Sequence, residues 1–201
     1  IMIEAIIFDL GDVFLNLNHQ ASVDAFKKLG LNEWNDDLKA KTILFETGKM
    51  DELHFMKAIQ KYLPNHELSE IRDAWNAIIG DFPLERLEFL EKLQNKYDIF
   101  LLSNTNPTHI DRFEHHVGLT FAREFYAHFN KIYFSYETKV RKPEEAVFNL
   151  ILKQNNLKPN KTLFVDDTLE HIEAAKALGI NTWQIIVGQD DVTNLFDKKL
   201  L

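Results

Sequence analysis

The chain contains no cysteine. This absence excludes a disulfide framework, a zinc site built from thiolates, and catalysis by a cysteine nucleophile. Long hydrophobic runs are absent as well, since no segment approaches the roughly eighteen apolar residues that a membrane-spanning helix needs. The first apolar segment lacks the basic stretch and the small-residue cleavage site of a secretory signal. We therefore expect a cytoplasmic protein that does not bind a membrane.

Positive charge is scarce relative to negative charge. Lys and Arg together number 23 against 31 Asp and Glu, which gives a formal net charge of −8. Such an acidic surface repels phosphate backbones, so we do not expect nucleic acid as a partner. With 45% hydrophobic and 27% charged residues over 201 positions, the chain is typical of one soluble globular domain with at most a modest insert.

Five short apolar runs predict the strands of a sheet. They are rich in Ile, Leu, Val and Phe on both faces, which is typical of strands covered on both sides in a parallel sheet. The runs are Glu4 to Phe8, Asp98 to Leu102, Ile132 to Phe134, Thr162 to Val165 and Thr182 to Val187. Between them, apolar residues recur at helical spacing, as in Leu84, Leu87, Leu90 and Leu93. This alternation predicts a doubly wound α/β fold with right-handed crossovers.

The segment from residue 18 to residue 80 breaks that alternation. Its apolar residues have helical spacing, as in Phe55, Met56, Ile59 and Leu63, and no convincing strand is present. We therefore predict a core of residues 1–17 and 81–201 and a helical insert of residues 18–80. Because the insert directly follows the first strand, we expect it to lie over the C-terminal end of that strand, where open α/β sheets bind ligands.

Polar clusters follow four of the predicted strands. The C-terminal ends of parallel strands share one edge of the sheet, so we expect the clusters to meet in one site, although each alone is typical of a turn. The adjacent carboxylates of Asp166 and Asp167 are costly unless a divalent cation lies beside them. The other clusters contain Asp9 with Gly11 and Asp12, Ser103 with Asn104, and Lys142. Together they offer a nucleophile, charge neutralisation and anion donors, which phosphoryl transfer to a carboxylate requires.

The four clusters, in this order and spacing, resemble the haloacid dehalogenase-like hydrolase superfamily along nearly the whole chain. The likeness extends to its helical-cap branch, which has an Asp-Asp pair in the last motif, and to small sugar-phosphate phosphatases, whose first motif also reads Asp-Leu-Gly. The resemblance implies a Rossmann-like three-layer α/β core with a parallel sheet and a small α-helical cap inserted after the first strand.

The resemblance also implies a role for each site residue. Asp9 would be the nucleophile that forms an aspartyl-phosphate, and Lys142 would neutralise charge on nucleophile and phosphate. Ser103 and Asn104 would bind the phosphoryl oxygens. Mg²⁺ would be bound by Asp167, Asp9 and the backbone carbonyl of Gly11. Asp166 would lie outside these direct ligands or be bound to the ion through water.

The chain departs from the superfamily pattern at two positions. Gly11 stands where most of these phosphatases carry a second Asp that acts as general acid and base, a contribution typically worth about 10²- to 10⁴-fold in rate. We therefore expect leaving groups more acidic than a simple alcohol, such as an anomeric sugar hydroxyl. Asp12 is one residue further along and should point away from the missing carboxylate. His171 replaces an Asp or Asn, and it either orients the acidic pair or is only a polar residue in a first helical turn.

Two predictions concern local structure. Pro107 after Asn106, and Pro143 after Lys142, each predict the first residue of a helix. The segment Glu46-Thr47-Gly48-Lys49 predicts an exposed turn of the insert, from which Lys49 could meet a substrate when the cap closes. The remaining histidines, His109 among them, are expected to be structural or exposed to solvent.

The predicted function is a magnesium-dependent phosphatase of a small phosphorylated metabolite such as a sugar phosphate, active as a monomer or homodimer. One alternative is a 2-haloacid dehalogenase, which in the same superfamily also uses an Asp nucleophile but needs no metal. The other is a non-catalytic protein that binds a phosphoryl ligand, which the glycine at position 11 would permit.

Overall fold

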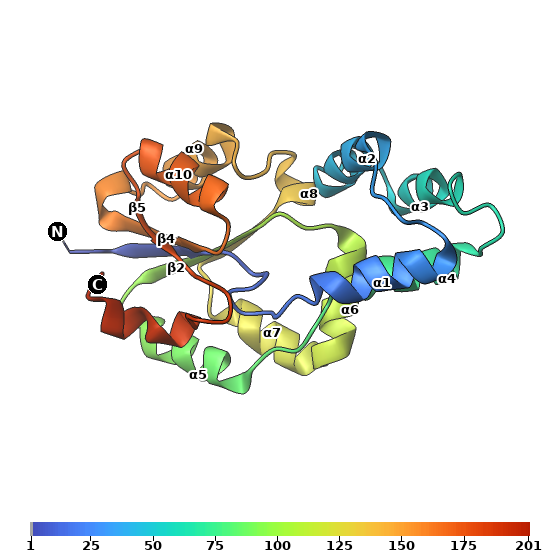
Figure 1. Cartoon of the computed structure of the whole chain (residues 1–201). Coiled ribbons are helices and arrows are strands. Elements are labelled where there is room, and N and C mark those ends of the chain that lie inside the picture. Colours follow the sequence, from blue (N-terminus) through green and yellow to red (C-terminus); the bar gives the residue numbers. More distant parts are fainter. Residues whose placement is uncertain (1) are drawn as a thin grey trace.

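A five-stranded sheet forms the centre of the computed structural model, which describes residues 2–201 (Figure 1). The strands are β1 (Ala5–Phe8), β2 (Asp98–Ser103), β3 (Lys131–Phe134), β4 (Thr162–Asp166) and β5 (Asn181–Gln184). All pairs are parallel, in the order β3-β2-β1-β4-β5. Phe8 at the end of β1 is level with Leu101 of β2 and Val165 of β4. The segments that follow these three strands therefore leave the sheet side by side.

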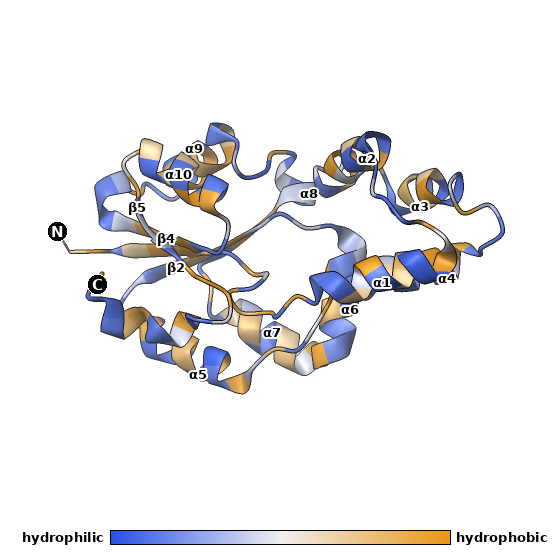
Figure 2. Cartoon of the chain, in the orientation of Figure 1, coloured by the Kyte–Doolittle hydropathy of each residue, from blue (hydrophilic) through white to orange (hydrophobic). Residues whose placement is uncertain are grey.

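Helices cover both faces of this sheet and complete three layers. They are α5 (Leu84–Leu93), α6 (Pro107–Val117), α7 (Leu119–Ala127), α8 (Ser135–Thr138), α9 (Glu145–Gln154) and α10 (Leu169–Ala177), with the 3-10 turns η1 (Pro159–Lys161) and η2 (Val192–Lys198). α5, α6, α7 and η2 pack with Ile6 and Phe8 on one face, whereas α9 and α10 pack with Ala5 and Ile7 on the other. Side chains alternate between the two faces of a strand, so β1 is buried throughout and is hydrophobic along its length (Figure 2).

Four helices form the insert between β1 and α5. They are α1 (His19–Leu29), α2 (Asp36–Glu46), α3 (Glu52–Gln60) and α4 (Leu68–Asn76). They lie beyond the C-terminal end of the sheet (Figure 1) and share a hydrophobic cluster that includes Phe26, Phe55 and Ile71. Leu17 and Ile79 form an antiparallel bridge where the chain enters and leaves the insert. That residues 18–80 form a separate unit stays a prediction.

The predicted α/β fold is confirmed, and two local predictions need correction. Asn106 and Pro107 begin α6 as expected, with the Asn106 side chain accepting a hydrogen bond from the His109 backbone N–H. The second proline does not begin a helix, because residues 141–144 form a turn closed by the Glu144 N–H on the Arg141 carbonyl, and α9 starts at Glu145. The last apolar run is shorter in the structure than predicted, since β5 ends at Gln184.

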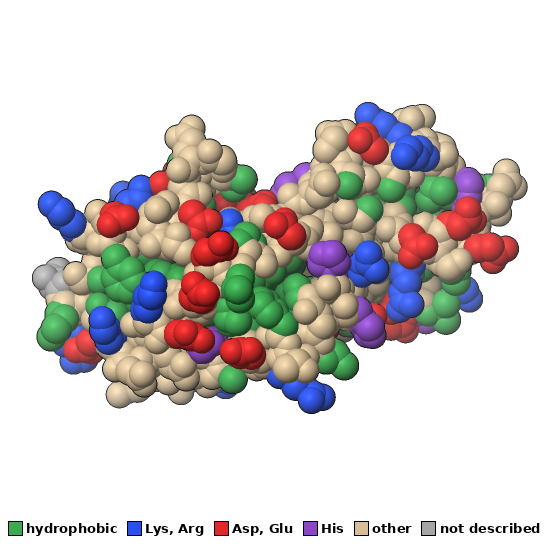
Figure 3. All heavy atoms as spheres, turned by 90° about the horizontal axis from the view of Figure 1, so that it is seen from below, with side chains coloured by type: hydrophobic (Ala, Val, Ile, Leu, Met, Phe, Trp, Pro, Cys, Tyr) green, Lys and Arg blue, Asp and Glu red, His purple; other side chains and the backbone are tan. Residues whose placement is uncertain are grey.

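The surface agrees with the charge balance of the sequence. On the face shown in Figure 3, Lys and Arg side chains are scattered among Asp and Glu, and no basic band crosses it. Within residues 2–201, each helix is too short or too polar to cross a lipid bilayer.

Candidate active site

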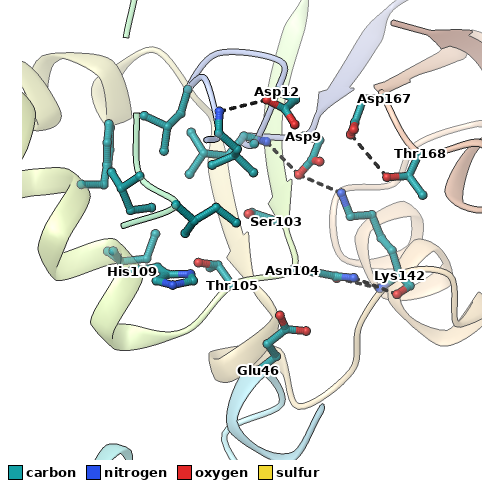
Figure 4. A pocket seen from close by; sticks show the side chains of 18 of the residues that line it. Asp9, Asp12, Glu46, Ser103, Asn104, Thr105, His109, Lys142, Asp167 and Thr168 are labelled. Atoms are coloured by element: carbon teal, nitrogen blue, oxygen red, sulfur yellow. Dashed lines mark hydrogen bonds and ion pairs between the residues drawn. The ribbon is translucent and has the colours of Figure 1, made fainter. Parts of the chain in front are cut away.

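The four polar clusters meet around one cavity at the C-terminal edge of the sheet. The cavity has a volume of about 370 Å³, within the range of small-molecule sites. All of the predicted site residues except the deeply buried Asp166 line it, as do residues of the insert (Figure 4). The convergence predicted from the strand ends is therefore present in the structure.

Asp9 and Lys142 form the centre of the cavity floor. Lys142 has no solvent-exposed side-chain surface, and its Nζ lies 2.8 Å from Asp9 Oδ1 and 2.6 Å from Asp166 Oδ2. Burial opposes the charge of Lys142, but the Asp166 and Asp9 carboxylates outweigh it and raise its pKa. Burial also raises the pKa of Asp9, which the Lys142 ammonium counteracts. The lysine thus keeps a charge beside the carboxylate that would attack phosphorus.

Asp166 contacts the Lys142 ammonium group and is itself contacted by His171. Asp166 Oδ1 accepts a hydrogen bond from the Thr168 backbone N–H at 2.8 Å and lies 3.1 Å from His171 Nδ1. Burial opposes ionisation of Asp166, yet Lys142 and His171 hold its pKa well below the usual range. The contact with Asp166 favours the interpretation that His171 orients the acidic pair over the interpretation that it is only a polar residue in a first helical turn.

Three carboxylates are placed to hold a cation. Asp9, Asp166 and Asp167 each bring an oxygen within 4.8 Å of the others. Burial and the neighbouring Asp166 raise the pKa of Asp167, so a cation bound there would stabilise the ionised carboxylate. Oxygen donors of this kind suit Mg²⁺, and the residues present therefore fit that ion. Asp166 already accepts from Lys142, whereas Asp167 and Asp9 retain oxygens that face the cavity (Figure 4).

Ser103 and Asn104 differ in how free they are to bind an anion. Ser103 ends β2 at the cavity, and its hydroxyl makes no hydrogen bond within the described part of the chain. Asn104 is tied to the backbone of Lys142, because its Nδ2 donates to the Lys142 carbonyl at 2.8 Å and its Oδ1 accepts from the Lys142 N–H at 2.9 Å. Asn104 therefore positions Lys142, and one Nδ2 hydrogen is left for a phosphoryl oxygen.

The position of the missing second Asp is closed by a leucine. A Cβ atom on Gly11 would lie 2.7 Å from Leu17 Cδ1, so a side chain fits there only if Leu17 moves. Asp12 lines the cavity, but its Oδ1 accepts from the Leu17 N–H at 2.9 Å and its Oδ2 lies 2.8 Å from His19 Nε2. Both oxygens of the nearest substitute carboxylate are therefore already engaged.

The insert contributes a side chain that the sequence analysis placed on an exposed turn. Glu46, the last residue of α2, reaches into the cavity, whereas Lys49 is exposed and does not line it. Glu46 Oε2 lies 3.0 Å from the terminal nitrogen NH2 of Arg141, which directly precedes Lys142. Contacts between insert and core decide this placement, and no sequence spacing signalled it.

His109 was also underestimated, since it lines the cavity and joins insert to core. Its ring stacks on Trp75 of α4 with centroids 4.7 Å apart. Asn106 Nδ2 lies 3.1 Å from His109 Nδ1, and His109 Nε2 lies 3.1 Å from the Trp75 carbonyl. Asn106 directly before α6 could have signalled its hydrogen bond to His109, but not the contact with the insert.

Known proteins are similar to this chain along most of its length. The family model of the haloacid dehalogenase-like hydrolases matches residues 3–179. A D-ribitol-5-phosphate phosphatase of Bacteroides thetaiotaomicron is 32% identical over 196 residues, which cover 94% of this chain and 95% of that protein. The structure of a haloacid dehalogenase family enzyme from the same organism, in complex with magnesium and inorganic phosphate, is 30% identical with a TM-score of 0.80, covering 94% of this chain and 96% of that one.

A dehalogenase is similar at greater distance. The structure of L-2-haloacid dehalogenase from Xanthobacter autotrophicus is 18% identical, with a TM-score of 0.61, and covers 99% of this chain and 84% of that one. At this level of identity the likeness shows a shared fold alone.

Proposed function

Because the chain belongs to the haloacid dehalogenase-like hydrolases, we propose that its Asp9 attacks the phosphorus of a small sugar phosphate or alditol phosphate. The enzyme is a magnesium-dependent phosphatase. The observation that carries the assignment of Asp9 is its position at the end of the central strand, 2.8 Å from a fully buried lysine and next to two further carboxylates.

The proposed reaction has two steps. An oxygen of Asp9 bonds to phosphorus, the bond from phosphorus to the substrate oxygen breaks, and the departing alkoxide takes a proton from water to leave as the alcohol. Water then hydrolyses the aspartyl-phosphate, which releases inorganic phosphate and restores the carboxylate. Mg²⁺, held by Asp9, Asp167 and the Gly11 carbonyl, would neutralise charge on the phosphoryl oxygens.

The surrounding residues stabilise the charge that moves during these steps. Lys142 donates to Asp9 and can neutralise negative charge on the phosphoryl group during transfer. The hydroxyl of Ser103 lines the cavity and can donate to a phosphoryl oxygen. Asn104 and Asp166 act through Lys142, by fixing its backbone and its ammonium group respectively. The cavity lies beneath the insert, which we propose acts as a cap that limits access of bulk water.

Release of inorganic phosphate from a panel of esters tests this function. The panel comprises D-ribitol 5-phosphate, an anomeric sugar 1-phosphate and acetyl phosphate, each assayed with Mg²⁺ and with excess chelator. We expect turnover only with Mg²⁺, and a loss of about 10⁴-fold or more in Asp9→Asn, the scale seen when a nucleophile is removed. Asp197→Asn, at an exposed position in η2, is the matched control and should keep wild-type rates.

The alternatives give different results in the same assay. Full activity of the enzyme on a 2-haloacid in excess chelator would favour the dehalogenase, for which the paired acids Asp166 and Asp167 have no evident use. Tight binding of beryllofluoride with Mg²⁺, but no turnover of any ester, would favour the non-catalytic binder. Wild-type rates in Asp9→Asn would refute the nucleophile.

A further inference from the structure

An ion pair joins insert and core at the edge of the cavity, away from the magnesium-binding carboxylates. Glu46 ends α2 and points toward the space beside Asn104 (Figure 4), and Arg141 approaches it from the segment before Lys142. Both side chains line the cavity, with 17% of the Glu46 side chain and 26% of the Arg141 side chain exposed. The proposed phosphatase reaction uses neither of them.

The backbone next to Glu46 is pressed against the core, which fixes where the carboxylate stands. Gly48 has a φ of +62°, and a Cβ atom there would collide with the Tyr136 carbonyl of α8. Lys139 Nζ donates to the Gly48 carbonyl at 3.2 Å and to the Tyr136 carbonyl at 2.9 Å. A side chain on such a support is preorganised for binding.

The pair is close but poorly hydrogen-bonded. Neither Glu46 Oε2 nor Arg141 Nε has a hydrogen-bond partner among the described residues, although both atoms are inaccessible to solvent. Burial raises the pKa of Glu46, and Arg141 counteracts that rise. The exposed parts of both side chains line the cavity, so a ligand that offers both a donor and an acceptor can reach the pair there.

We propose that Glu46 and Arg141 bind neighbouring hydroxyl groups on the organic part of the substrate. A carboxylate accepts from one hydroxyl and a guanidinium donates to the next, so the pair matches a diol. Because the two charges cancel, the pair gives little attraction to a substrate that carries an extra ammonium or carboxylate group. This inference rests on the proposed function and narrows its substrate to polyhydroxylated phosphate esters.

A second Glu–Arg pair in the insert provides a matched control. Glu52 of α3 pairs with Arg72 of α4, and neither side chain lines the cavity of Asp9. Their side chains are 34% and 45% exposed, respectively, so solvent screens them. Removal of Glu52 changes the charge of the insert by the same amount as removal of Glu46 but leaves the cavity intact.

The test compares two esters that have the same type of leaving group. D-ribitol 5-phosphate carries hydroxyls along its chain, and 1-pentyl phosphate lacks them, while both release a primary alcohol. We measure kcat/KM for each and take the ratio, in wild type, Glu46→Ala, Glu46→Gln and Glu52→Ala. Circular dichroism and thermal melting establish that each variant is folded.

We expect Glu46→Ala to lower the ratio by about 10- to 100-fold, the range for loss of a hydrogen bond to a charged group. Glu46→Gln keeps an acceptor of the same shape and should lower the ratio less, and Glu52→Ala should leave it unchanged. An equal loss of kcat/KM for both esters in Glu46→Ala would overturn the inference, because the pair would then only brace the insert. An unchanged ratio would overturn it as well.

Failure of the proposed function can be distinguished from failure of this inference. If wild-type protein hydrolyses neither of these esters nor any compound of the panel, the proposed function is wrong, and calorimetric binding of the two esters replaces turnover as the readout. Tighter binding of D-ribitol 5-phosphate that is lost in Glu46→Ala would still support the diol site. Equal binding of both esters would refute it.

Discussion

The core side of the cavity is built from charges buried at strand ends, whereas the insert contributes Glu46 from the end of α2, together with His19 and Ile78. Lys142 and Asp166 have no exposed side-chain surface and contact each other at 2.6 Å. Glu46 and Arg141 lie 3.0 Å apart and are partly exposed at the cavity. Both arrangements are in place before a ligand arrives, but only the second keeps exposed polar surface for the organic part of a substrate.

This difference separates two tasks. Transfer of a phosphoryl group needs charges whose positions do not depend on the rest of the substrate, which the strand ends provide. Choice of substrate needs contacts beyond the phosphate, which we propose that the insert supplies from α2. Changes in the core should therefore affect all substrates alike, and changes in the insert should affect substrates unequally.

The largest effect is expected for Lys142→Met. It leaves Asp9 and Asp166 buried without their shared counter-ion, and loss of one partner of a buried pair typically costs about 3–5 kcal/mol of unfolding free energy. Loss of the ammonium should also lower kcat by about 10³-fold for every ester. Denaturant unfolding and the phosphate-release panel measure both effects.

Lys161→Met is the control for that variant. Lys161 pairs with Glu4 at the surface, with 35% of its side chain exposed, and such pairs contribute about 0–1 kcal/mol. If Lys142→Met lost no more stability than Lys161→Met, or retained activity on one ester of the panel, the core would not be the preassembled, substrate-independent half of the site.

The same contrast explains what could be predicted from the sequence. Asp9, Ser103, Lys142 and Asp167 follow buried strands, and parallel strands bring their ends to one edge, so local pattern determined their meeting place. The contact of the Asn104 amide with the Lys142 backbone, by contrast, is a pairing across 38 residues that no local pattern encodes, and the predicted binding of phosphate by Asn104 stays a prediction.

The insert was harder to predict for a physical reason. Glu46 is the last residue of α2 and begins a polar segment typical of an exposed turn, but Gly48 two residues later is packed against α8, which brings Glu46 to the cavity. Docking of two units depends on the shape of both surfaces. The helical periodicity of residues 18–80 indicates short helices but not which of their ends faces the sheet.

Gly48→Ala should give the next largest effect, and it tests whether that contact positions the insert. An alanine at a φ of +62° costs about 1–2 kcal/mol, and overpacking against the Tyr136 carbonyl adds about 1–3 kcal/mol. Because the collision pushes Glu46 from its place, we expect KM for D-ribitol 5-phosphate to rise several-fold. Thermal unfolding and steady-state kinetics are the measurements.

Gly30→Ala separates backbone strain from the collision. Gly30 also has a positive φ, +104°, but the nearest atom to a Cβ there is 4.0 Å away. This variant should lose only the cost of its backbone conformation and keep the wild-type KM. A KM that rises equally in both variants would mean that general loosening of the insert, rather than contact with α8, weakens substrate binding.

The smallest effect concerns His109, where core and insert meet on the far side of the cavity. Asn106 Oδ1 accepts from the His109 backbone N–H at 3.0 Å, so the Asn106 amide nitrogen faces His109 Nδ1 as a donor. The ring must then accept at Nδ1 and donate from Nε2 to the Trp75 carbonyl. Protonation at Nδ1 would set two donors against each other, and burial lowers the pKa of His109 to about 4.

A histidine that is neutral in the folded state but has an unfolded pKa of about 6.5 binds protons preferentially in the unfolded state at pH values between 4 and 6.5. Its contribution to stability is therefore complete above about pH 6.5 and is lost as the pH falls toward 4, by about 1–2 kcal/mol between pH 7 and pH 5. His109→Gln should reduce the decline in unfolding free energy over this interval by that amount, and His116→Gln, at an exposed site in α6, is the control for removal of a histidine from the surface. Identical pH slopes in wild type and His109→Gln would show that the contact between α6 and the insert accommodates a protonated His109. The insert would then be held no more rigidly at α6 than at Glu46.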